Sequence, residues 1–197
     1  MNALRPLAFW RHRTKTAADK SETATFDGVS RARALPRPAI KWLGTGARIA
    51  LRSFDFAHDA DAICAFQQET YRVNFPDFDF TPEFDQAFRH DLRRASLDTA
   101  HEMFVLDEGE LVGFLWLVVC ENTWTSERYG YINNIFVSPR LRGQGLAGEL
   151  MAQSDAFFRN RRIRRVRLTV TASNQEAVRL YERAGYEVTR WEMEKEL

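Results

Sequence analysis

The chain has 197 residues, 45% of them apolar and 28% charged, which is typical of a single globular domain. This composition excludes collagen, a coiled coil and full disorder, and two cysteines are too few for a disulfide framework or a thiolate metal cage. The near-apolar run 111–120 is shorter than the roughly 20 residues that a membrane-spanning helix needs, so no membrane partner is expected.

The formal net charge of +1 conceals an asymmetry along the chain. Residues 1–45 sum to +6, whereas residues 46–197 sum to −5. Within the second part, residues 55–110 carry −10 and residues 140–167 carry +6. Successive blocks of opposite sign indicate either two ligands of opposite charge or charges that the fold intermixes, and the sequence leaves both interpretations open.

The first 45 residues are basic, contain several Pro, Gly, Ser, Thr and Ala, and lack sustained hydrophobic periodicity. We therefore predict a disordered or loosely docked extension over residues 1–45 and one folded domain over residues 46–197. The apolar stretch 7–10 is too short for the core of a secretion signal, and three acidic residues in the extension argue against a transit peptide. We expect a cytoplasmic protein.

From residue 46 onward, the hydrophobic pattern predicts alternating strands and helices. A first strand spans residues 47–53 and a helix follows from Asp59. Thr81 and Pro82 are residue types favoured at a helix cap and first helical position, and they begin the second helix. The remaining elements are strands over 102–106, 111–119 and 129–137, a helix from about 145, a strand over 166–171, a helix over 177–184 and a last strand over 186–193. This order predicts an α+β (mixed α/β) domain with a mostly antiparallel central sheet of about six strands and about four flanking helices.

The most informative segment joins the strand that ends at Val137 to the helix that begins near Gly145. Gly143 and Gly145 allow the backbone to approach a ligand closely and to point successive amides in one direction. The N-terminus of a helix favours an anion, and Arg140 and Arg142 add positive charge. We predict a phosphate site here; the alternative is a plain strand-to-helix turn that uses glycine for steric reasons.

This turn matches neither a Walker loop nor a dinucleotide fingerprint, because no Gly-Lys-Ser/Thr follows and no third glycine falls at the right spacing. Residues 140–145, Arg-Leu-Arg-Gly-Gln-Gly, resemble the Gln/Arg-x-x-Gly-x-Gly/Ala signature of the GNAT superfamily of N-acetyltransferases. A downstream block is similar to the Asn-x-x-Ala-x-x-Leu-Tyr-x-x-x-Gly-Phe/Tyr segment of that family. Its matching residues are Asn174, Ala177, Leu180, Tyr181, Gly185 and Tyr186. The resemblance spans residues 47–197.

The resemblance implies transfer of an acetyl group from acetyl-CoA to a primary amine by direct attack in a ternary complex. The backbone amides of residues 142–147 would hold the pyrophosphate. The pantetheine arm would pair with the strand that carries Phe136, in a wedge between this strand and the next one, over residues 164–171. The implied cofactor-binding residues are Phe136, Val137, Arg142, Gly143, Gln144, Gly145, Leu146, Ala147 and Asn174. No metal is expected, because the histidines show no ligand spacing with cysteines or carboxylates.

The resemblance gives Tyr181 the role of general acid toward the departing CoA thiolate. A phenol with a pKa of about 10 can supply that proton or donate a hydrogen bond. The alternative is that the Tyr181 ring only packs in the core. From the residue pattern alone, Ser173 and Glu176 form a capping box, which places Asn174 in the first helical turn and makes a structural role for Asn174 an alternative.

The general base stays open. Many members of the family carry a glutamate on the strand before the phosphate turn, whereas this chain has Asn133 and Asn134 there. Glu121 and Glu127 precede that strand and are candidates, acting directly or through water. An acceptor amine of low pKa would need no base.

The resemblance places the acceptor near the acidic stretch 55–110. Between residues 75 and 85, carboxylates alternate with phenylalanines, an arrangement that suits a cationic amine. These residues are Asp77, Asp79, Glu83 and Asp85 with Phe75, Phe78, Phe80 and Phe84. We expect a small-molecule or peptide amine, such as a polyamine, an aminoglycoside or a basic peptide. Alternatively, the carboxylates face water and the rings fill the core.

Two other function classes stay open. A non-catalytic acyl-CoA sensor on the same fold would account for the missing strand carboxylate. A nucleic-acid-binding module could use the basic extension and the arginine-rich run 159–165. This run lies about 20 Å along a helix from the phosphate turn. Because cations are favourable at a helix C-terminus, we interpret it as a solvated helix end and do not expect nucleic acid as a partner. A homodimer also stays open.

Overall fold

A six-stranded sheet forms the centre of the computed structural model, which describes residues 40–42, 48–75, 77–193 and 195. The strands follow one another across the sheet in chain order, and neighbours are antiparallel except for the parallel pair β5 and β6. The strands are β1 (Ile40–Trp42), β2 (Arg48–Ser53), β3 (His101–Asp107), β4 (Leu111–Glu121), β5 (Arg128–Val137) and β6 (Val166–Arg167). The predicted mixed, mostly antiparallel sheet is confirmed.

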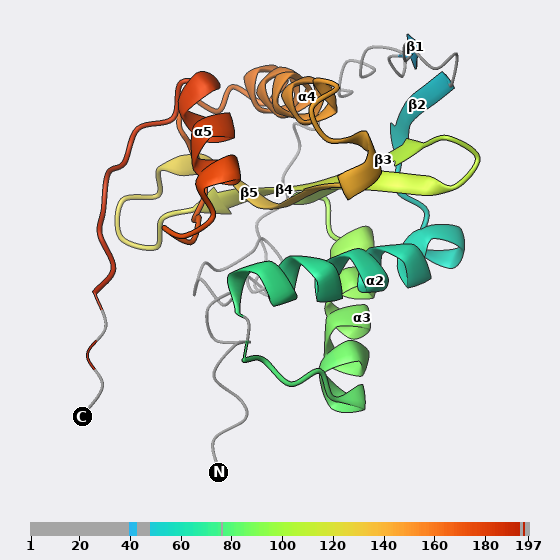
Figure 1. Cartoon of the computed structure of the whole chain (residues 1–197). Coiled ribbons are helices and arrows are strands. Elements are labelled where there is room, and N and C mark those ends of the chain that lie inside the picture. The colour runs from blue at the N-terminus through green and yellow to red at the C-terminus, as the bar shows by residue number, and fades with distance from the viewer. Residues whose placement is uncertain (1–39, 43–47, 76, 194, 196–197) are drawn as a thin grey trace.

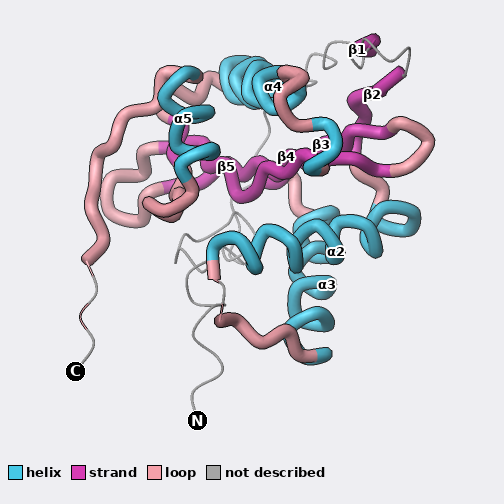
Figure 2. The backbone as a smooth tube through the Cα atoms, in the orientation of Figure 1, coloured by secondary structure: helices cyan, strands magenta, loops and turns pink. Residues whose placement is uncertain are grey.

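Helices cover both faces of this sheet. In Figure 1, α2 and α3 lie below the sheet, whereas α4 and α5 lie above it, and Figure 2 shows the same three layers. The helices are α2 (Phe56–Asn74), α3 (Pro82–Leu97), α4 (Leu146–Asn160) and α5 (Gln175–Arg183). A short 3-10 helix, η2 (Pro139–Leu141), follows β5. The predicted α+β domain with about four flanking helices is confirmed.

Local sequence determines where the two lower helices begin. The Asp55 carboxylate accepts a hydrogen bond from the Ala57 amide and caps α2. The Thr81 hydroxyl accepts from the Phe84 amide at 3.3 Å and caps α3, with Pro82 at the first helical position. The predicted start of the second helix is therefore confirmed, and its register turns Phe84 and Leu92 toward the core.

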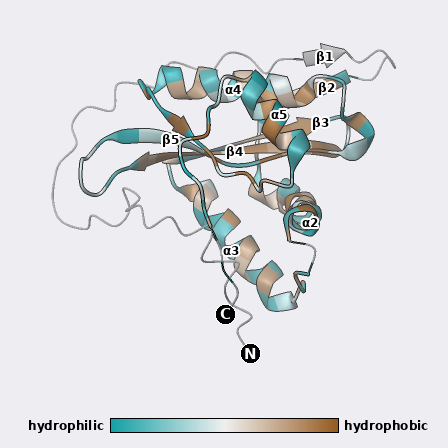
Figure 3. Cartoon of the chain, turned by 60° about the vertical axis from the view of Figure 1, so that its left-hand side comes forward, coloured by the Kyte–Doolittle hydropathy of each residue, from teal (hydrophilic) through white to brown (hydrophobic). Residues whose placement is uncertain are grey.

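The core consists of two apolar clusters, one on each face of the sheet. One cluster joins the sheet to α4 and α5 and includes Leu115, Phe157 and Tyr181. The other joins the sheet to α2 and α3 and includes Ile63 and Leu92. The middle strands are buried on both faces, which explains why β4 is an almost continuous apolar run (Figure 3).

The extension predicted over residues 1–45 lies outside the described residues, except for β1. This strand pairs antiparallel with β2 and was not predicted, because three residues are too few to show a periodic pattern. The boundary between the extension and the folded domain stays a prediction.

The last predicted strand, over residues 186–193, is wrong. The described residues there belong to no strand, and the Trp191 side chain is 82% exposed. Likewise, only Val166 and Arg167 of the predicted strand 166–171 pair with β5. The reason is the same in both cases: β-prone residues predict extended backbone, but a strand also needs a partner at hydrogen-bonding distance.

Candidate active site

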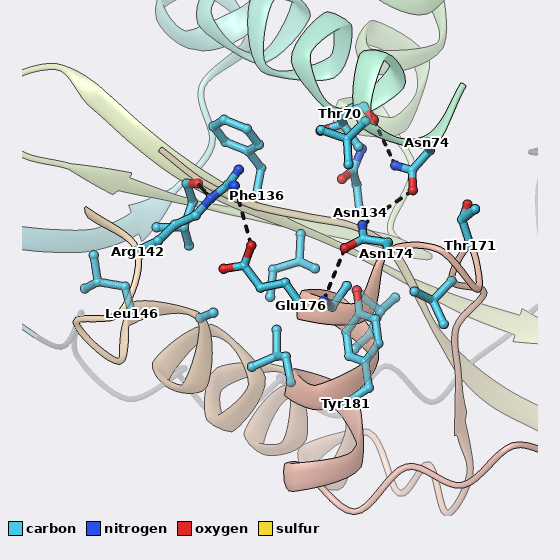
Figure 4. A pocket seen from close by; sticks show the side chains of 18 of the residues that line it. Thr70, Asn74, Asn134, Phe136, Arg142, Leu146, Thr171, Asn174, Glu176 and Tyr181 are labelled. Carbon is cyan, nitrogen blue, oxygen red and sulfur yellow. Dashed lines mark hydrogen bonds and ion pairs between the residues drawn. The ribbon is translucent and has the colours of Figure 1, made fainter. Parts of the chain in front are cut away.

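A cavity of about 500 Å³ opens where β5 and β6 separate. The two strands pair only at Gly130 with Val166 and at Tyr131 with Arg167. Beyond these pairs, residues 131–137 line one wall of the cavity and residues 169–171 line another. The turn after β5, the face of α5 and the last turns of α2 complete it (Figure 4). The wedge predicted between these two segments is therefore present.

The turn after β5 places a helix N-terminus at one end of the cavity. Gly143 and Gly145 have φ angles of 75° and 80°, in the left-handed region that favours glycine. Gly145 is the N-cap residue of α4, and none of the described side chains accepts a hydrogen bond from the first amides of this helix. These amides are thus available to an anion, and the helix dipole favours its binding.

The structure brings the predicted cofactor residues together at this cavity. Phe136 and Val137 line it from β5, and Asn174 lines it from the start of α5. From the turn and the first turn of α4, the lining residues include Arg142, Gly143, Gly145, Leu146 and Ala147. Gln144 is the one predicted cofactor residue that does not line the cavity.

Arg142 links three elements around the phosphate end of the cavity. Its Nε donates to the Val137 carbonyl at 3.1 Å. Its two terminal nitrogens lie 3.9 Å from a Glu69 carboxylate oxygen on α2 and 3.6 Å from one of Glu176 on α5. Arg140, in contrast, forms an ion pair with Glu108 at 2.7 Å and does not line the cavity. The expectation that both arginines add charge to the site holds for Arg142 only.

Tyr181 lies both in the core and on the cavity wall. Its side chain is 9% exposed and belongs to the core cluster on the α4 and α5 side. It also lines the cavity, and in Figure 4 its ring points from α5 toward Asn174. Burial raises the pKa of Tyr181 to about 12, so the phenol stays protonated at neutral pH.

The predicted capping box at the start of α5 is wrong. Asn174 is the N-cap itself, because its side-chain oxygen accepts from the Ala177 amide at 3.2 Å. Asn and Ser cap helices about equally well, so the sequence did not fix which of two adjacent positions begins the helix. The Asn174 side-chain nitrogen donates to the Asn74 side-chain oxygen on α2 at 3.5 Å, across the cavity (Figure 4).

A β-bulge in β5 lies on the cavity wall. Trp116 of β4 pairs with Asn134, but the next residue, Leu117, pairs with Ile132, so Asn133 is an extra residue. Asn133 and Asn134 both line the cavity. Asn134 is also buried and donates a hydrogen bond to the buried side chain of Gln67 on α2.

The two candidate bases do not line the cavity. Glu127 lies 3.4 Å from Arg165, the residue before β6, and Glu121 lies at the end of β4. The carboxylates that do line the cavity are Glu69 and Glu176, both next to Arg142.

The acidic and aromatic segment 75–85 also lies largely outside the cavity. Its four carboxylates do not line the cavity, whereas Phe75 does. The rings of Phe75, Phe78, Phe80 and Phe84 pack around Tyr71 between α2 and α3. The interpretation in which these rings fill the core therefore fits the structure better.

Sequence reasoning missed the contribution of α2. Glu69, Thr70, Val73 and Asn74 line the cavity from this helix. Their spacing of one, three and one residues places them on one face of the helix, which is the signal that could have singled them out. The sequence does not show that this face lies opposite α5.

In the described part of the chain, no group of histidine, cysteine and carboxylate side chains could hold a metal ion. The described helices also include none that is both long and apolar enough to cross a membrane.

Comparison with known proteins agrees with this geometry. The model of the Acetyltransferase (GNAT) family matches residues 60–186, which include every residue that lines the cavity. The chain belongs to this family. A crystal structure of a GCN5-related N-acetyltransferase from Ralstonia eutropha JMP134 has a TM-score of 0.64 and 26% identity, covering 76% of this chain and 98% of that one.

The curated relatives of this GNAT domain include two named mycothiol acetyltransferase. The one from Thermobispora bispora is 32% identical over 196 residues, covering 92% of this chain and 62% of the relative. The one from Amycolatopsis mediterranei is 30% identical over 145 residues, covering 70% of this chain and 46% of the relative. The GNAT domain described here therefore spans less than two thirds of the length of these relatives.

Proposed function

We propose that this GNAT domain transfers the acetyl group of acetyl-CoA to the primary amine of a small molecule. The observation that carries the proposal is the wedge between β5 and β6, which runs from an uncapped helix N-terminus to Tyr181. The family match and the relatives named mycothiol acetyltransferase support it.

The cofactor fits the wedge through backbone groups. The pyrophosphate of acetyl-CoA would accept hydrogen bonds from the amides at the start of α4, with Arg142 beside it. In the described residues, β6 does not pair with β5 beyond Tyr131, which leaves the backbone of residues 132–137 open on that side. The amides of the pantetheine arm would bond there like an added strand.

The transfer itself needs one bond formed and one bond broken. The neutral amine nitrogen attacks the thioester carbonyl carbon, and a backbone amide near Val137 stabilises the oxyanion. This attack forms the C–N bond; the nitrogen loses its extra proton to water, and the C–S bond breaks as the oxyanion returns to a carbonyl. The departing thiolate takes a proton or a hydrogen bond from Tyr181, whose phenol is protonated at neutral pH.

A non-catalytic acyl-CoA sensor is the second candidate. It is favoured by the presence of Asn133 and Asn134 at the strand position where many family members carry a glutamate. Such a protein would bind acetyl-CoA in the same wedge without turning it over.

The experiment that separates the two candidates measures binding and turnover together. Acetyl-CoA binding is measured by calorimetry, and release of the CoA thiol is measured with a panel of amines. The proposed transferase should bind acetyl-CoA and release thiol only when an amine is present. Binding without release for any amine would support the sensor instead.

The Arg142→Ala variant tests whether acetyl-CoA binds in the wedge between β5 and β6. Removing Arg142 should weaken acetyl-CoA binding about tenfold, because a charge-assisted hydrogen bond to phosphate contributes about 1.5 kcal/mol or more. Arg140→Ala is the matched control, since Arg140 pairs with Glu108 outside the cavity, and should bind normally. Equal affinities for the two variants would contradict the proposed cofactor site.

A further inference from the structure

Strand β6 leaves one edge of the sheet open. It is the last strand of the sheet and pairs with β5 only, through Val166 and Arg167. The Arg165 carbonyl accepts from the Gly130 amide on the β5 side, so the alternation of an extended chain turns the backbone groups of Val166 to the outer edge. Among the described residues, no strand pairs with that edge. The outer edge therefore offers hydrogen-bonding groups to a further strand.

The chain after α5 provides a segment that can form such a strand. Tyr186 packs on the domain, because its amide donates to the Tyr181 carbonyl at 3.0 Å and the two rings lie 6.0 Å apart. From residue 187 to residue 193, every residue is exposed and belongs to no strand. In Figures 1 and 2, this part of the chain leads from α5 away from the sheet. Segment 186–193 thus has the β-prone composition of a strand and lies beside no strand of its own chain.

Large apolar side chains of this segment are exposed. Val188 is 65% exposed, Trp191 82% and Met193 93%. These are three of the six large apolar side chains that are exposed in the described part of the chain. In an extended segment, Trp191 and Met193 lie on one side and Val188 on the other. Single exposed apolar side chains are common on protein surfaces, but three within six residues indicate a surface that another protein covers.

The open edge and the chain after α5 carry opposite charge. Residues 159–167, which lead into β6 and include it, contain six arginines and no acidic residue. Arg162 and Arg164 are exposed and form no ion pair with another described residue. Residues 186–197 contain four glutamates against one arginine and one lysine. A strand formed by segment 186–193 along β6 would therefore bring acidic side chains close to unpaired arginines.

We propose that two copies of this chain form a dimer in which segment 186–193 of each copy adds as a strand to the outer edge of β6 of the other copy. The backbone, the apolar side chains and the acidic charge that fit this edge are all present on the chain itself. Each copy gives one segment and receives one, so a twofold axis closes the contact at two copies. The dimer is independent of acetyl transfer, so its failure would leave the proposed function standing.

This strand addition would also support one wall of the cavity. Residues 169–171 line the cavity, but they do not pair with β5, because the two strands separate after Arg167. A strand along the outer edge would give this wall a backbone partner on the side away from the cavity. The second copy would thus stabilise the separation of β5 and β6.

The first test measures the mass and the backbone protection of the full chain in solution. Sedimentation equilibrium at concentrations from about 1 to 100 μM should show a dimer that dissociates on dilution. Hydrogen exchange should show that the amides of Val166 and of residues 187–193 are protected in the dimer and exchange faster in the monomer. A monomer at every concentration, or a dimer in which these amides exchange as fast as in the monomer, would overturn the inference.

Matched substitutions of exposed apolar side chains locate the contact. Trp191→Ser should raise the Kd of the dimer by at least about tenfold, as expected for an aromatic side chain at an interface. Leu97→Ser is the control, because Leu97 is 79% exposed at the end of α3, on the opposite face of the sheet (Figure 1), and should leave the Kd unchanged. Equal Kd values for the two variants would contradict the proposed surface.

Charge reversal distinguishes pairing between copies from pairing within one chain. One variant carries Arg162→Glu and Arg164→Glu, and the other carries Glu187→Arg and Glu192→Arg; all four residues are exposed, and thermal unfolding checks that both variants fold. Each variant alone should dimerise at least about tenfold more weakly, because like charges then meet. An equimolar mixture should form a heterodimer, detected by native mass spectrometry. A mixture that stays monomeric, as expected if the segment folds back on its own β6, would overturn the inference.

Discussion

Tyr181 shows how one side chain can serve both the core and the site. Its ring belongs to the cluster beneath α4 and α5, and its hydroxyl end reaches the cavity wall near Asn174. Because burial raises its pKa to about 12, the phenol is a donor over the whole physiological range.

We predict that Tyr181→Phe lowers kcat for acetyl transfer by about 10²-fold, the lower end of the range for general acid catalysis. The ring and its packing are retained, so affinity for acetyl-CoA and thermal stability should stay close to those of the unmodified protein. Steady-state kinetics and calorimetry on the two proteins measure both quantities. An unchanged kcat would restrict Tyr181 to a packing role.

The sequence predicted the residues of the site that lie in one local pattern and missed those that depend on packing. The turn around Gly143 and the block from Asn174 to Tyr181 have fixed spacings, and the structure places both at the cavity. Glu69 and Asn74 belong to α2, and Asn74 precedes Asn174 of α5 by 100 residues, so only tertiary packing brings the two helices opposite each other. The prediction for the acidic segment 75–85 failed for the same reason. This segment follows α2 in the chain, but its carboxylates do not lie on the side of α2 that faces the cavity.

Strand β5 approaches α4 closely at Gly130. A Cβ atom added to Gly130 would lie 2.6 Å from a ring carbon of Phe158 on α4. Gly148, within α4, has free space around the corresponding position. The two glycines therefore form a matched pair for testing this contact.

We predict that Gly130→Ala lowers the free energy of unfolding by about 1–3 kcal/mol, because the added methyl overpacks the contact with Phe158. Gly148→Ala should be neutral or stabilising by up to about 1 kcal/mol, since alanine favours a helix over glycine. Urea denaturation of both variants measures the difference. Comparable stability of the two would mean that α4 shifts away from β5 without cost.

Elements with strong local signals were predicted correctly, and elements defined by a partner were not. The Thr81-Pro82 start of α3 and the hairpin of β3 and β4 depend on caps, turns and alternation that the sequence displays. The segment 186–193 has β-prone residues but no strand partner in the structure. Strand β1 shows the reverse, because its pairing with β2 defines it although its three residues carry no pattern.

At the scale of the whole molecule, the charge blocks seen in the sequence partly neutralise one another. Glu108, from the acidic block, pairs with Arg140 at 2.7 Å, and Glu102 lies 3.7 Å from Arg161. Both arginines belong to the basic block 140–167. Of the two interpretations left open by the sequence, intermixing by the fold describes these pairs, while only Arg142 of this block contributes its charge to the cavity.

An ion pair with a buried carboxylate joins the sheet to α2. Arg52 of β2 donates two hydrogen bonds to Asp59, at 2.7 and 2.8 Å, and a third to Asp107 of β3 at 2.8 Å. Asp59 is 2% exposed and also accepts from the Asp55 amide. Removal of the Asp59 carboxylate would take two hydrogen bonds from the Arg52 guanidinium and leave the one to Asp107. It would also remove the acceptor of the Asp55 amide.

We predict that Asp59→Ala lowers the free energy of unfolding by about 3 kcal/mol, the effect of breaking one side of a buried pair. Asp61→Ala is the control, because Asp61 pairs with Arg89 but is 88% exposed, and its loss should cost less than about 1 kcal/mol. Thermal or urea unfolding distinguishes these values. A loss below about 1 kcal/mol for Asp59→Ala would show that Arg52 and the Asp55 amide find other partners.

The bulge at Asn133 changes which residues of β5, odd-numbered or even-numbered, face α2 and α3. Before it, the odd-numbered Tyr129 and Tyr131 face α2 and α3; after it, the even-numbered Asn134 and Phe136 do so. Deleting Asn133 would remove the bulge and leave regular alternation, in which Tyr131, Asn134 and Phe136 still face α2 and α3. Asn133 therefore adds one residue between the β4–β5 hairpin and the phosphate turn without turning either half of β5 over, whereas a one-residue shift in a strand without a bulge moves every later side chain to the other face of the sheet.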